Sequence, residues 1–270
     1  MPGQLLGDRY EVERQLGKKS GRWTLLARDL VTEKPVILKL LFVDEEMMPD
    51  DLKLFKREIE TLQTLSHPCT PKYLGYFEID LPRDGKALAL IQSYMEGTSL
   101  QQYLQQGRTL SEAEALQIAQ AALEVLLYLH EHQPPIIHRD IKPGNVLLAS
   151  APEVITSQVC LVDFGSVKSF AASDFTSFTL VGTDGYMPPE QMGRRAVRAS
   201  DLYSLGVTLI TGMSGIEPEQ LPRRGLQIDI TQVVNVSSAF ANWLRQMTEP
   251  ELDKRFKIAQ EALAALIRIT

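Results

Sequence analysis

Hydrophobic positions in the first third of the chain occur in short runs or alternate with polar ones, a pattern that predicts β-strands. The predicted strands cover residues 10–16, 23–27, 36–43, 73–79 and 87–94. One helix is predicted between the third and fourth strands, because apolar residues recur there at helical spacing: Leu54, Phe55, Ile59, Leu62 and Leu65. Asp50 or Asp51 is expected to cap its start near Pro49, and His67-Pro68 to end it.

Helical periodicity dominates after Gly97. Ser111 and Glu114 form a capping box that predicts a long helix over 112–131, ended by Pro134-Pro135. Short strands are predicted around 136–137, 146–148 and 159–162, a Ser/Thr-rich loop over 166–182, and helices over 200–211, 237–247 and 258–269. The prediction is an α+β protein with a small β-rich N-lobe (8–94) and a larger helical C-lobe (95–270).

Composition narrows the class of protein. The 270 residues are 44% hydrophobic and 23% charged, as in globular proteins, and 28 Lys and Arg against 34 Asp and Glu give a net charge of −6. This acidic balance argues against a nucleic-acid partner. No apolar run is long enough to span a membrane, no signal peptide is recognisable, and Cys69 and Cys160 have no metal-ligand spacing. We therefore expect a cytoplasmic protein with two reduced thiols.

Charged side chains gather next to the short strand around 146–148. Asp140, Lys142 and Asn145 lie within six residues, and Asp163 ends the following apolar strand before Gly165. Such charges beside apolar segments are costly unless they are paired or used. The oxygens of Asn145 and Asp163 would suit a hard cation such as Mg²⁺.

These segments form a series in a recognisable order: VILK (36–39), Glu58 on the first helix, HRDIKPGN (138–145), VDFG (162–165) and GTDGYMPPE (182–190). Together they resemble the eukaryotic-like Ser/Thr protein kinase family, particularly its bacterial, cyanobacterial-type members. The resemblance extends from about Tyr10 to Ile269. It implies a single bilobal protein kinase domain over 1–270, with ATP and Mg²⁺, or Mn²⁺, as cofactors and a protein as substrate.

The resemblance also implies catalytic roles. Lys39 would contact the α- and β-phosphates and pair with Glu58. Asp140 would orient or accept the proton of the substrate hydroxyl, Lys142 would stabilise the transferring phosphoryl group, and Asn145 and Asp163 would hold the metal. Taken singly, Lys39 is more typical of an edge-strand lysine and Glu58 of an exposed helix charge, so the joint occurrence carries the assignment.

Further positions match supporting parts of the family. Thr183 would bond Asp140 and Lys142, Glu190 would pair with Arg255, and Asp201 would support the catalytic loop. Arg139 would pair with a phosphate in the loop between Asp163 and Glu190, for which the candidate acceptors are Thr176, Ser177 and Thr179, with Ser173 weaker.

The phosphate-covering loop departs from the family pattern of three glycines. Gly17 is kept, Lys19 and Arg22 replace the second and third glycines, and Gly21 is one place early. A side chain forced into a left-handed conformation would cost about 1–2 kcal/mol, whereas the two positive charges would attract the nucleotide phosphates. We expect altered nucleotide affinity.

The adenine site implied by the resemblance departs from the pattern as well. Ile37 replaces a smaller residue beneath the base, and Thr24 replaces Val opposite. Gln92 is the expected gatekeeper. The remaining predicted lining residues are the hinge Ser93, Tyr94 and Met95 and, beyond it, Leu147.

Two classes of function remain at this point. The first is a Ser/Thr protein kinase that transfers the ATP γ-phosphoryl group to protein hydroxyls. The alternative is a pseudokinase that binds nucleotide weakly or acts as a scaffold, which the altered loop and Ile37 favour. A small-molecule kinase is disfavoured by the intact GTDGYMPPE segment, which resembles a peptide-docking loop. The sequence carries no signal for an oligomeric state.

Overall fold

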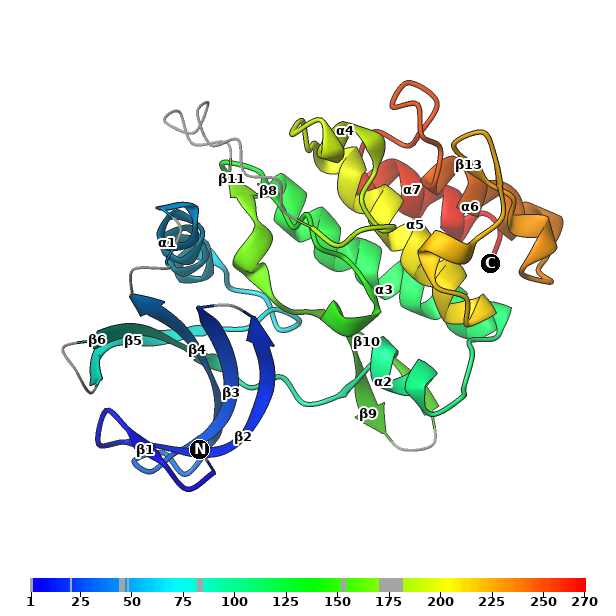
Figure 1. Ribbon diagram of the computed structural model, residues 1–270. Helices are drawn as coiled ribbons and strands as arrows, with labels where there is room; N and C mark the ends of the chain where they lie inside the picture. The colour runs from blue at the N-terminus through cyan, green and yellow to red at the C-terminus, as the bar shows by residue number, and fades with distance from the viewer. Residues whose placement is uncertain are drawn as a thin grey trace. The chain divides into compact units, whose positions relative to one another are not determined.

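The computed structural model describes residues 2–19, 21–43, 47, 49–81, 85–151, 154–169 and 182–270 (Figure 1). Within it the chain divides into two compact units. The first comprises Met1–Ser66 and Pro71–Met95, and the second comprises His67–Thr70 and Glu96–Thr270. The short segment 67–70 therefore belongs with the helical unit although it follows the first helix in sequence.

The first unit is built on an antiparallel sheet whose described strands have the order β1-β2-β3-β4-β6-β5. Their bounds are β1 Leu5–Leu6, β2 Tyr10–Lys19, β3 Arg22–Asp29, β4 Pro35–Val43, β5 Tyr73–Leu81 and β6 Gly85–Ser93. The predicted strands are confirmed, with ends that differ by up to three residues, and β1 is an addition to the prediction. Strands β2 and β3 are joined by two residues, of which Gly21 has a φ of 65°. Such a tight hairpin favours glycine, which explains its position in the sequence.

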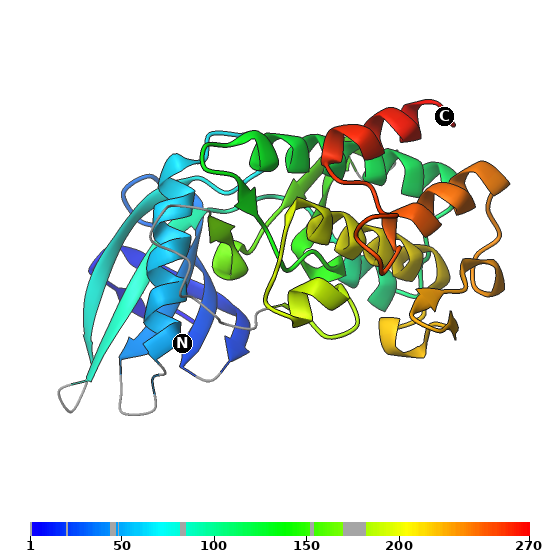
Figure 2. The same ribbon diagram turned by 90° about the horizontal axis from the view of Figure 1, so that it is seen from above.

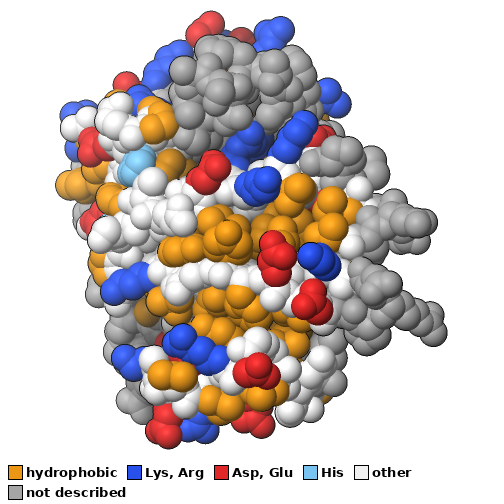
Figure 3. Space-filling view, turned by 90° about the vertical axis from the view of Figure 1, so that its left-hand side faces the viewer, with side chains coloured by type: hydrophobic (Ala, Val, Ile, Leu, Met, Phe, Trp, Pro, Cys, Tyr) orange, Lys and Arg blue, Asp and Glu red, His pale blue; other side chains and the backbone are white. Residues whose placement is uncertain are grey.

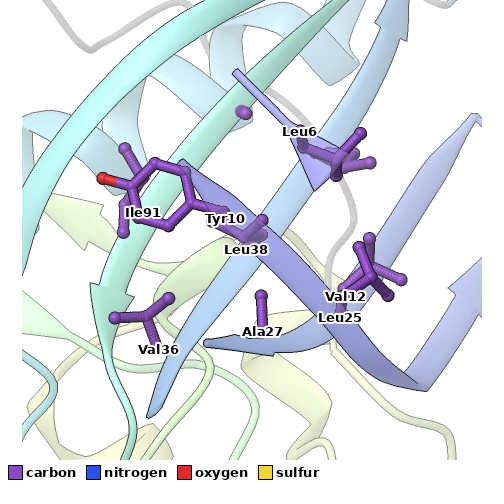
Figure 4. Close-up of a cluster of buried hydrophobic side chains, with 10 residues drawn as sticks. Leu6, Tyr10, Val12, Leu25, Ala27, Val36, Leu38 and Ile91 are labelled. Carbon is purple, nitrogen blue, oxygen red and sulfur yellow. The ribbon is translucent and has the colours of Figure 1, made fainter. Parts of the chain in front are cut away.

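The two faces of this sheet carry different side chains. Residues opposite each other on β3 and β4 share a face, and the pairs Leu25–Leu38 and Ala27–Val36 point into a buried hydrophobic cluster (Figure 4). Because side chains alternate along a strand, Thr24 and Lys39, another opposing pair, lie on the other face. The sheet therefore separates an apolar core from the face that carries the predicted nucleotide-binding residues.

Helix α1, Pro49–Thr64, lies along the sheet on the face of Lys39 (Figure 2). The expected cap at Asp50 or Asp51 is wrong, because both residues lie inside the first helical turn. Pro49 occupies the first position of the helix, where its missing N–H costs nothing. The two carboxylates that follow instead stabilise the helix through their favourable interaction with its dipole.

The second unit is mainly helical. Its helices are α2 Leu100–Gln105, α3 Glu112–Glu131, α4 Pro189–Met192, α5 Arg198–Ser214, α6 Ser238–Met247 and α7 Ala259–Ile267. Its short strands are β7 Thr98–Ser99, β8 Ile136–Ile137, β9 Val146–Ala151, β10 Val154–Leu161, β11 Lys168–Ser169, β12 Arg223–Arg224 and β13 Gln227–Ile228. Single 3₁₀ turns cover Pro143–Asn145, Phe164–Ser166, Pro218–Gln220 and Ile230–Gln232. The predicted loop over 166–182 thus contains the end of one turn and β11 in its described part.

Helix α3 begins where the capping box predicts. The Ser111 hydroxyl accepts a hydrogen bond from the backbone N–H of Glu114 at 3.3 Å, and the Glu114 carboxylate accepts one from the Ser111 N–H at 2.7 Å. Helix α5 is buried from Ala199 to Gly212. Gly206 of α5 lies so close to α6 that an added Cβ would be 2.9 Å from the Met247 Cβ. A helix buried on all sides forms the centre of this unit.

The two cysteines are free and buried in the second unit. The backbone N–H of Leu161 donates to the Cys69 carbonyl at 3.1 Å, which joins the segment 67–70 to β10. Burial, and after it the neighbouring Cys69, together raise the pKa of the Cys160 thiol to about 12. A protonated, buried thiol is a poor nucleophile, so Cys160 has a packing role.

Hydrophobic side chains also reach the surface. Figure 3 shows them on one face of the molecule, bordered by charged side chains. Leu74 and Tyr76 of the edge strand β5 are 51% and 57% exposed. Exposed apolar residues are ordinary on protein surfaces and do not alone mark an interface. Among the described residues, no helix is both long and apolar enough to cross a membrane.

Candidate active site

Four side chains of the second unit form a hydrogen-bonded group around Asp140. Lys142 Nζ lies 3.0 Å from Asp140 Oδ2 and donates to Thr183 Oγ1 at 2.6 Å. The Thr183 hydroxyl in turn donates to Asp140 Oδ1 at 2.7 Å. Asn145 Nδ2 donates to Asp140 Oδ2 at 3.1 Å and to the Asp140 carbonyl at 2.8 Å. The sequence separates Thr183 from Asp140 by 43 residues, and the fold brings them into contact as the resemblance implies.

Asn145 and Asp163 are the predicted metal ligands. Because Asn145 uses its amide nitrogen to donate to Asp140, its amide oxygen remains available as an acceptor. Asp163 follows the end of β10 and has a left-handed backbone with a φ of 67°. Its Oδ1 atom accepts a hydrogen bond from the Gly165 N–H at 3.4 Å. An amide oxygen and a carboxylate are suitable ligands for a hard divalent cation.

Asp201 supports the segment that precedes Asp140. This carboxylate is fully buried on α5 and accepts hydrogen bonds from the backbone N–H groups of His138 and Arg139, each at 2.9 Å. His130 Nε2 of α3 lies 2.9 Å from Asp201 Oδ2. The family resemblance implies that Asp201 supports this loop, but it gives no indication that His130 takes part.

Arg139 has a left-handed backbone, with a φ of 67°, which is strained for a residue with a side chain. The strain is offset by surrounding hydrogen bonds. The guanidinium donates to the carbonyls of Ser166 and Val167, and the Arg139 carbonyl accepts from Gln191 Nε2 at 2.7 Å. Its predicted phosphorylated partners, Ser173, Thr176, Ser177 and Thr179, lie outside the described residues. Pairing of Arg139 with a phosphate therefore stays a prediction.

His138 is completely buried and has a structural position. Its ring packs against Phe164 with centroids 4.9 Å apart, and its Nε2 atom is 3.2 Å from the Val162 carbonyl. Burial lowers the pKa of His138, an effect opposed by the carboxylates of Asp201, Asp140 and Asp163. A neutral imidazole packed in the core is not placed to act as a base.

Glu190, the last residue of the segment 182–190, forms a buried ion pair with Arg255. Arg255 donates from Nη1 to Glu190 Oε1 at 2.7 Å and from Nη2 to Oε2 at 3.2 Å. The Arg255 side chain is fully buried, and its remaining hydrogen bonds go to the carbonyls of Ala199, Glu249 and Pro250. The pairing that the resemblance implies for these two residues is present.

The first unit carries the other predicted catalytic pair. Lys39 Nζ of β4 donates to Glu58 Oε1 of α1, and the two side chains are 12% and 5% exposed. Thr24 lies opposite Lys39 across the β3–β4 pair, and Gln92 lies opposite Ile37 across the β4–β6 pair. Four predicted nucleotide-binding residues therefore share one face of the sheet. Within the described part of the chain, the buried Gln92 Oε1 atom has no hydrogen-bond partner.

Lys19 and Arg22 of the phosphate-covering loop lack the backbone strain that the sequence predicts for them. Lys19 and Arg22 face each other as the last pair of the β2–β3 hairpin, so both have extended backbones. Their replacement of glycine therefore costs no left-handed conformation. The side chain of Lys19 lies outside the described structure. Gly17 lies opposite Thr24, where an added Cβ would make only ordinary contacts.

Arg22 binds a protein carboxylate. Its Nη2 atom donates to Asp51 Oδ1 at 2.5 Å and to the Asp51 carbonyl at 3.3 Å. The expectation that the Arg22 charge faces a nucleotide is thus incomplete, because the Asp51 carboxylate of the first unit already pairs with that charge. No sequence motif marks this contact, which joins positions 29 residues apart.

The predicted hinge and Leu147 have modest local roles. The Ser93 hydroxyl accepts a hydrogen bond from the Lys72 N–H at 2.9 Å and lies 3.8 Å from the Met95 sulfur. Tyr94 and Met95 follow the end of β6 and are half-buried. Leu147 of β9 pairs with Ser99 and Cys160 and is half-buried. Binding of adenine by these four residues stays a prediction.

Comparison with known proteins identifies the family. The protein kinase domain matches residues 10–267, so the chain belongs to the protein kinase family. Protein kinases as a family use ATP, a divalent cation and a protein substrate.

Similar proteins occur in cyanobacteria and other bacteria. Serine/threonine-protein kinase B of Synechocystis sp. is 34% identical over 97% of this chain and 46% of its own length. Serine/threonine-protein kinase PknA of Nostoc sp. is 32% identical over 97% of this chain and 48% of its own length. Serine/threonine-protein kinase PrkC of Bacillus subtilis is 28% identical over 80% of this chain and 32% of its own length. The chain spans about half the length of the two cyanobacterial relatives, and the prediction of a bacterial, cyanobacterial-type member is confirmed.

Proposed function

We propose that this chain is a Ser/Thr protein kinase that transfers the γ-phosphoryl group of ATP to hydroxyl groups of proteins, with Mg²⁺ as the preferred cation and Mn²⁺ as a substitute. One observation carries the proposal: the closed group of hydrogen bonds among Asp140, Lys142, Thr183 and Asn145. Every member has a charge or a hydrogen-bonding group that phosphoryl transfer uses.

Asp140 is the proposed acceptor for the proton of the substrate hydroxyl. Its Oδ1 atom is held by the Thr183 hydroxyl and its Oδ2 atom by Lys142 and Asn145. Held in this way, the carboxylate has little freedom to rotate, so it can orient the attacking oxygen without reorganising. The buried carboxylate of Asp201 fixes the backbone just before it.

Two lysines would neutralise the phosphates. Lys142 lies beside the proposed base, where its ammonium group can stabilise charge on the transferring phosphoryl group. Lys39 is held by Glu58 on the sheet face that also carries Thr24 and Ile37. This pairing fixes the direction of the long lysine side chain, so that less freedom is lost when it binds the α- and β-phosphates.

Asn145 and Asp163 are the proposed ligands of the cation, since one offers a free amide oxygen and the other a carboxylate beyond the end of β10. When bound, a divalent cation supplies neutralisation of the phosphate charge. The chain's own contribution is to hold the two oxygens: Asn145 by its bonds to Asp140, and Asp163 by the Gly165 N–H.

The alternative of a pseudokinase has no specific observation in its favour. Its main argument was strain in the phosphate-covering loop, and Lys19 and Arg22 both lie in regular strands. Ile37 is the other departure that favours a pseudokinase. It is buried within the sheet, where it packs opposite Gln92 and Leu26.

The test is phosphoryl transfer from ATP labelled at its γ-phosphate to the chain itself and to a generic protein substrate, with Mg²⁺ and separately with Mn²⁺. The comparison is between the parent and the Asp140→Asn variant, which keeps the shape of the side chain. We expect incorporation on Ser and Thr by the parent and a loss of at least about 100-fold in the variant. Thermal unfolding of both proteins controls for loss of structure.

Absence of label from the parent under both metals, with the protein folded, would overturn the proposal. Equal label in parent and variant would remove Asp140 from the mechanism. Label on tyrosine alone would refute the assigned substrate class.

A further inference from the structure

Arg22 stands where the family pattern has a glycine, and the register of the sheet determines where its side chain points. Arg22 lies opposite Leu41, two residues along β3 and β4 from the opposing pair Thr24 and Lys39. Side chains two residues apart on a strand share a face. Arg22 therefore lies on the same face of the sheet as Lys39, away from the hydrophobic cluster around Leu25 and Leu38.

Helix α1 offers two carboxylates to this face. Asp51 and Glu58 are seven residues apart, which is two helical turns, so they lie on the same side of the helix and about 10 Å apart along its axis. Glu58 binds Lys39, and Asp51 binds Arg22. The helix is thus attached to the sheet at two points, one in its first turn and one beyond its middle.

The contact at Asp51 has a specific geometry. Arg22 Nη2 donates both to the Asp51 carboxylate, at 2.5 Å, and to the Asp51 carbonyl, at 3.3 Å. Both side chains are 30% exposed, so the pair is only partly screened by water. The neighbouring Asp50 carboxylate lies 3.6 Å from Lys53 of the same helix, with both side chains more than half exposed. Only the second of the two adjacent acidic residues therefore holds the helix to the sheet.

We propose that Arg22 is a positioning residue: through Asp51 it fixes α1 against the sheet and thereby keeps Glu58 on Lys39. In this view the arginine that replaces a glycine provides an internal clamp for the helix. The clamp holds the helix in the orientation that pairs Glu58 with Lys39. The catalytic part of the inference rests on the proposed function, because the Lys39–Glu58 pair matters to activity only in an active kinase.

A direct role for Arg22 in binding nucleotide phosphates predicts a different pattern of effects. If Arg22 bound phosphate, its loss would weaken ATP binding, whereas loss of Asp51 would free the arginine and would not weaken it. If Arg22 acts as a clamp, loss of either partner frees the same helix. The two variants then have equal effects, and the double variant is no worse than either single one.

The experiment compares Arg22→Gln, Asp51→Asn and the double variant of the 270-residue chain with the parent. Asp50→Asn is the matched control, since it removes the same charge from the same helical turn. The first readout is hydrogen exchange of the α1 amides without nucleotide. For a pair with this exposure we expect exchange to be faster by about two- to fivefold in each clamp variant, and unchanged in the control. In 1 M salt the difference between the parent and the clamp variants should shrink towards zero.

The second readout is the kinetics of phosphoryl transfer. A clamp predicts that Arg22→Gln and Asp51→Asn lower kcat/KM by the same factor, and that the exchanged pair Arg22→Asp/Asp51→Arg recovers part of the loss. A higher KM for ATP in Arg22→Gln alone would assign Arg22 to the phosphates and overturn the clamp.

Hydrogen exchange equal to that of the parent in both clamp variants would also overturn it. Because exchange does not depend on catalysis, a parent that transfers no phosphate would refute the proposed function while the exchange result still decides the clamp.

Discussion

Removal of one partner of the buried pair between Glu190 and Arg255 should destabilise the second unit strongly. The Arg255 side chain has no exposed surface and makes two hydrogen bonds to Glu190. In Glu190→Leu the guanidinium stays buried without its counter-charge. In Arg255→Met the Glu190 carboxylate keeps, among the described residues, a hydrogen bond from the Ser200 hydroxyl at 2.8 Å. Leaving a buried charge uncompensated costs about 3–5 kcal/mol, so each single variant should lose that amount.

The double variant distinguishes the energy of the ion pair from that of the packing around the two side chains. If the two losses were independent, Glu190→Leu/Arg255→Met would lose about 6–10 kcal/mol in total. Because the second substitution removes the charge that the first left unpaired, we expect a loss close to that of one single variant. Some cost remains, since the carbonyls of Ala199, Glu249 and Pro250 lose their donor.

The assay is urea unfolding followed by circular dichroism, with thermal unfolding as a check. Lys254→Met is the matched control, because Lys254 pairs with Glu251 at 2.7 Å on the surface and both side chains are more than 60% exposed. Loss of that pair should cost less than about 1 kcal/mol. Additive losses in the double variant, or a loss near 1 kcal/mol in either single variant, would refute the reasoning.

Three further substitutions test the structure. The Arg9 guanidinium holds the pKa of the Asp29 carboxyl below its ordinary value of about 3.9. The parent should therefore have a higher free energy of unfolding than Asp29→Asn above about pH 5, and this difference should decrease as the pH falls through 4 and below. Urea titrations at several pH values measure the difference. Gly206→Ala should destabilise by about 1–3 kcal/mol in urea unfolding because its Cβ would overlap α6, whereas Gly144→Ala, which meets open space, should not. Gln92→Met should stabilise by about 1 kcal/mol in thermal unfolding, since it removes a buried acceptor with no partner in the described residues; a lower melting temperature would show that the amide is used.

Much of the fold follows from local chemistry that the sequence states directly. The capping box of Ser111 and Glu114 predicts the start of α3, and the β-rich run of residues 36–43 predicts the central strand β4. A second capping box, formed by Ser99 and Gln102, begins α2 and carries the same sequence signal. The start of α1 was misjudged because acidic residues are favourable both as caps and inside the first turn.

The site was predictable where its residues form short motifs, and less so where it depends on tertiary contacts. Asp140, Lys142 and Asn145 lie within six residues, so their proximity follows from the sequence. The contact of Thr183 with Asp140 was reached only through the family resemblance. The binding of Arg22 to Asp51 could not be predicted, because a long, flexible arginine at a strand end can reach many partners and only the packing of α1 selects one.

Phosphoryl transfer from γ-labelled ATP by the parent and by Asp140→Asn is the most direct test of the central claim that the group around Asp140 is a catalytic site. The account predicts label on Ser and Thr of the parent or of a protein substrate, and a loss of at least about 100-fold in the variant with an unchanged melting temperature. A folded parent that transfers no phosphate with either Mg²⁺ or Mn²⁺, or a variant as active as the parent, would contradict it.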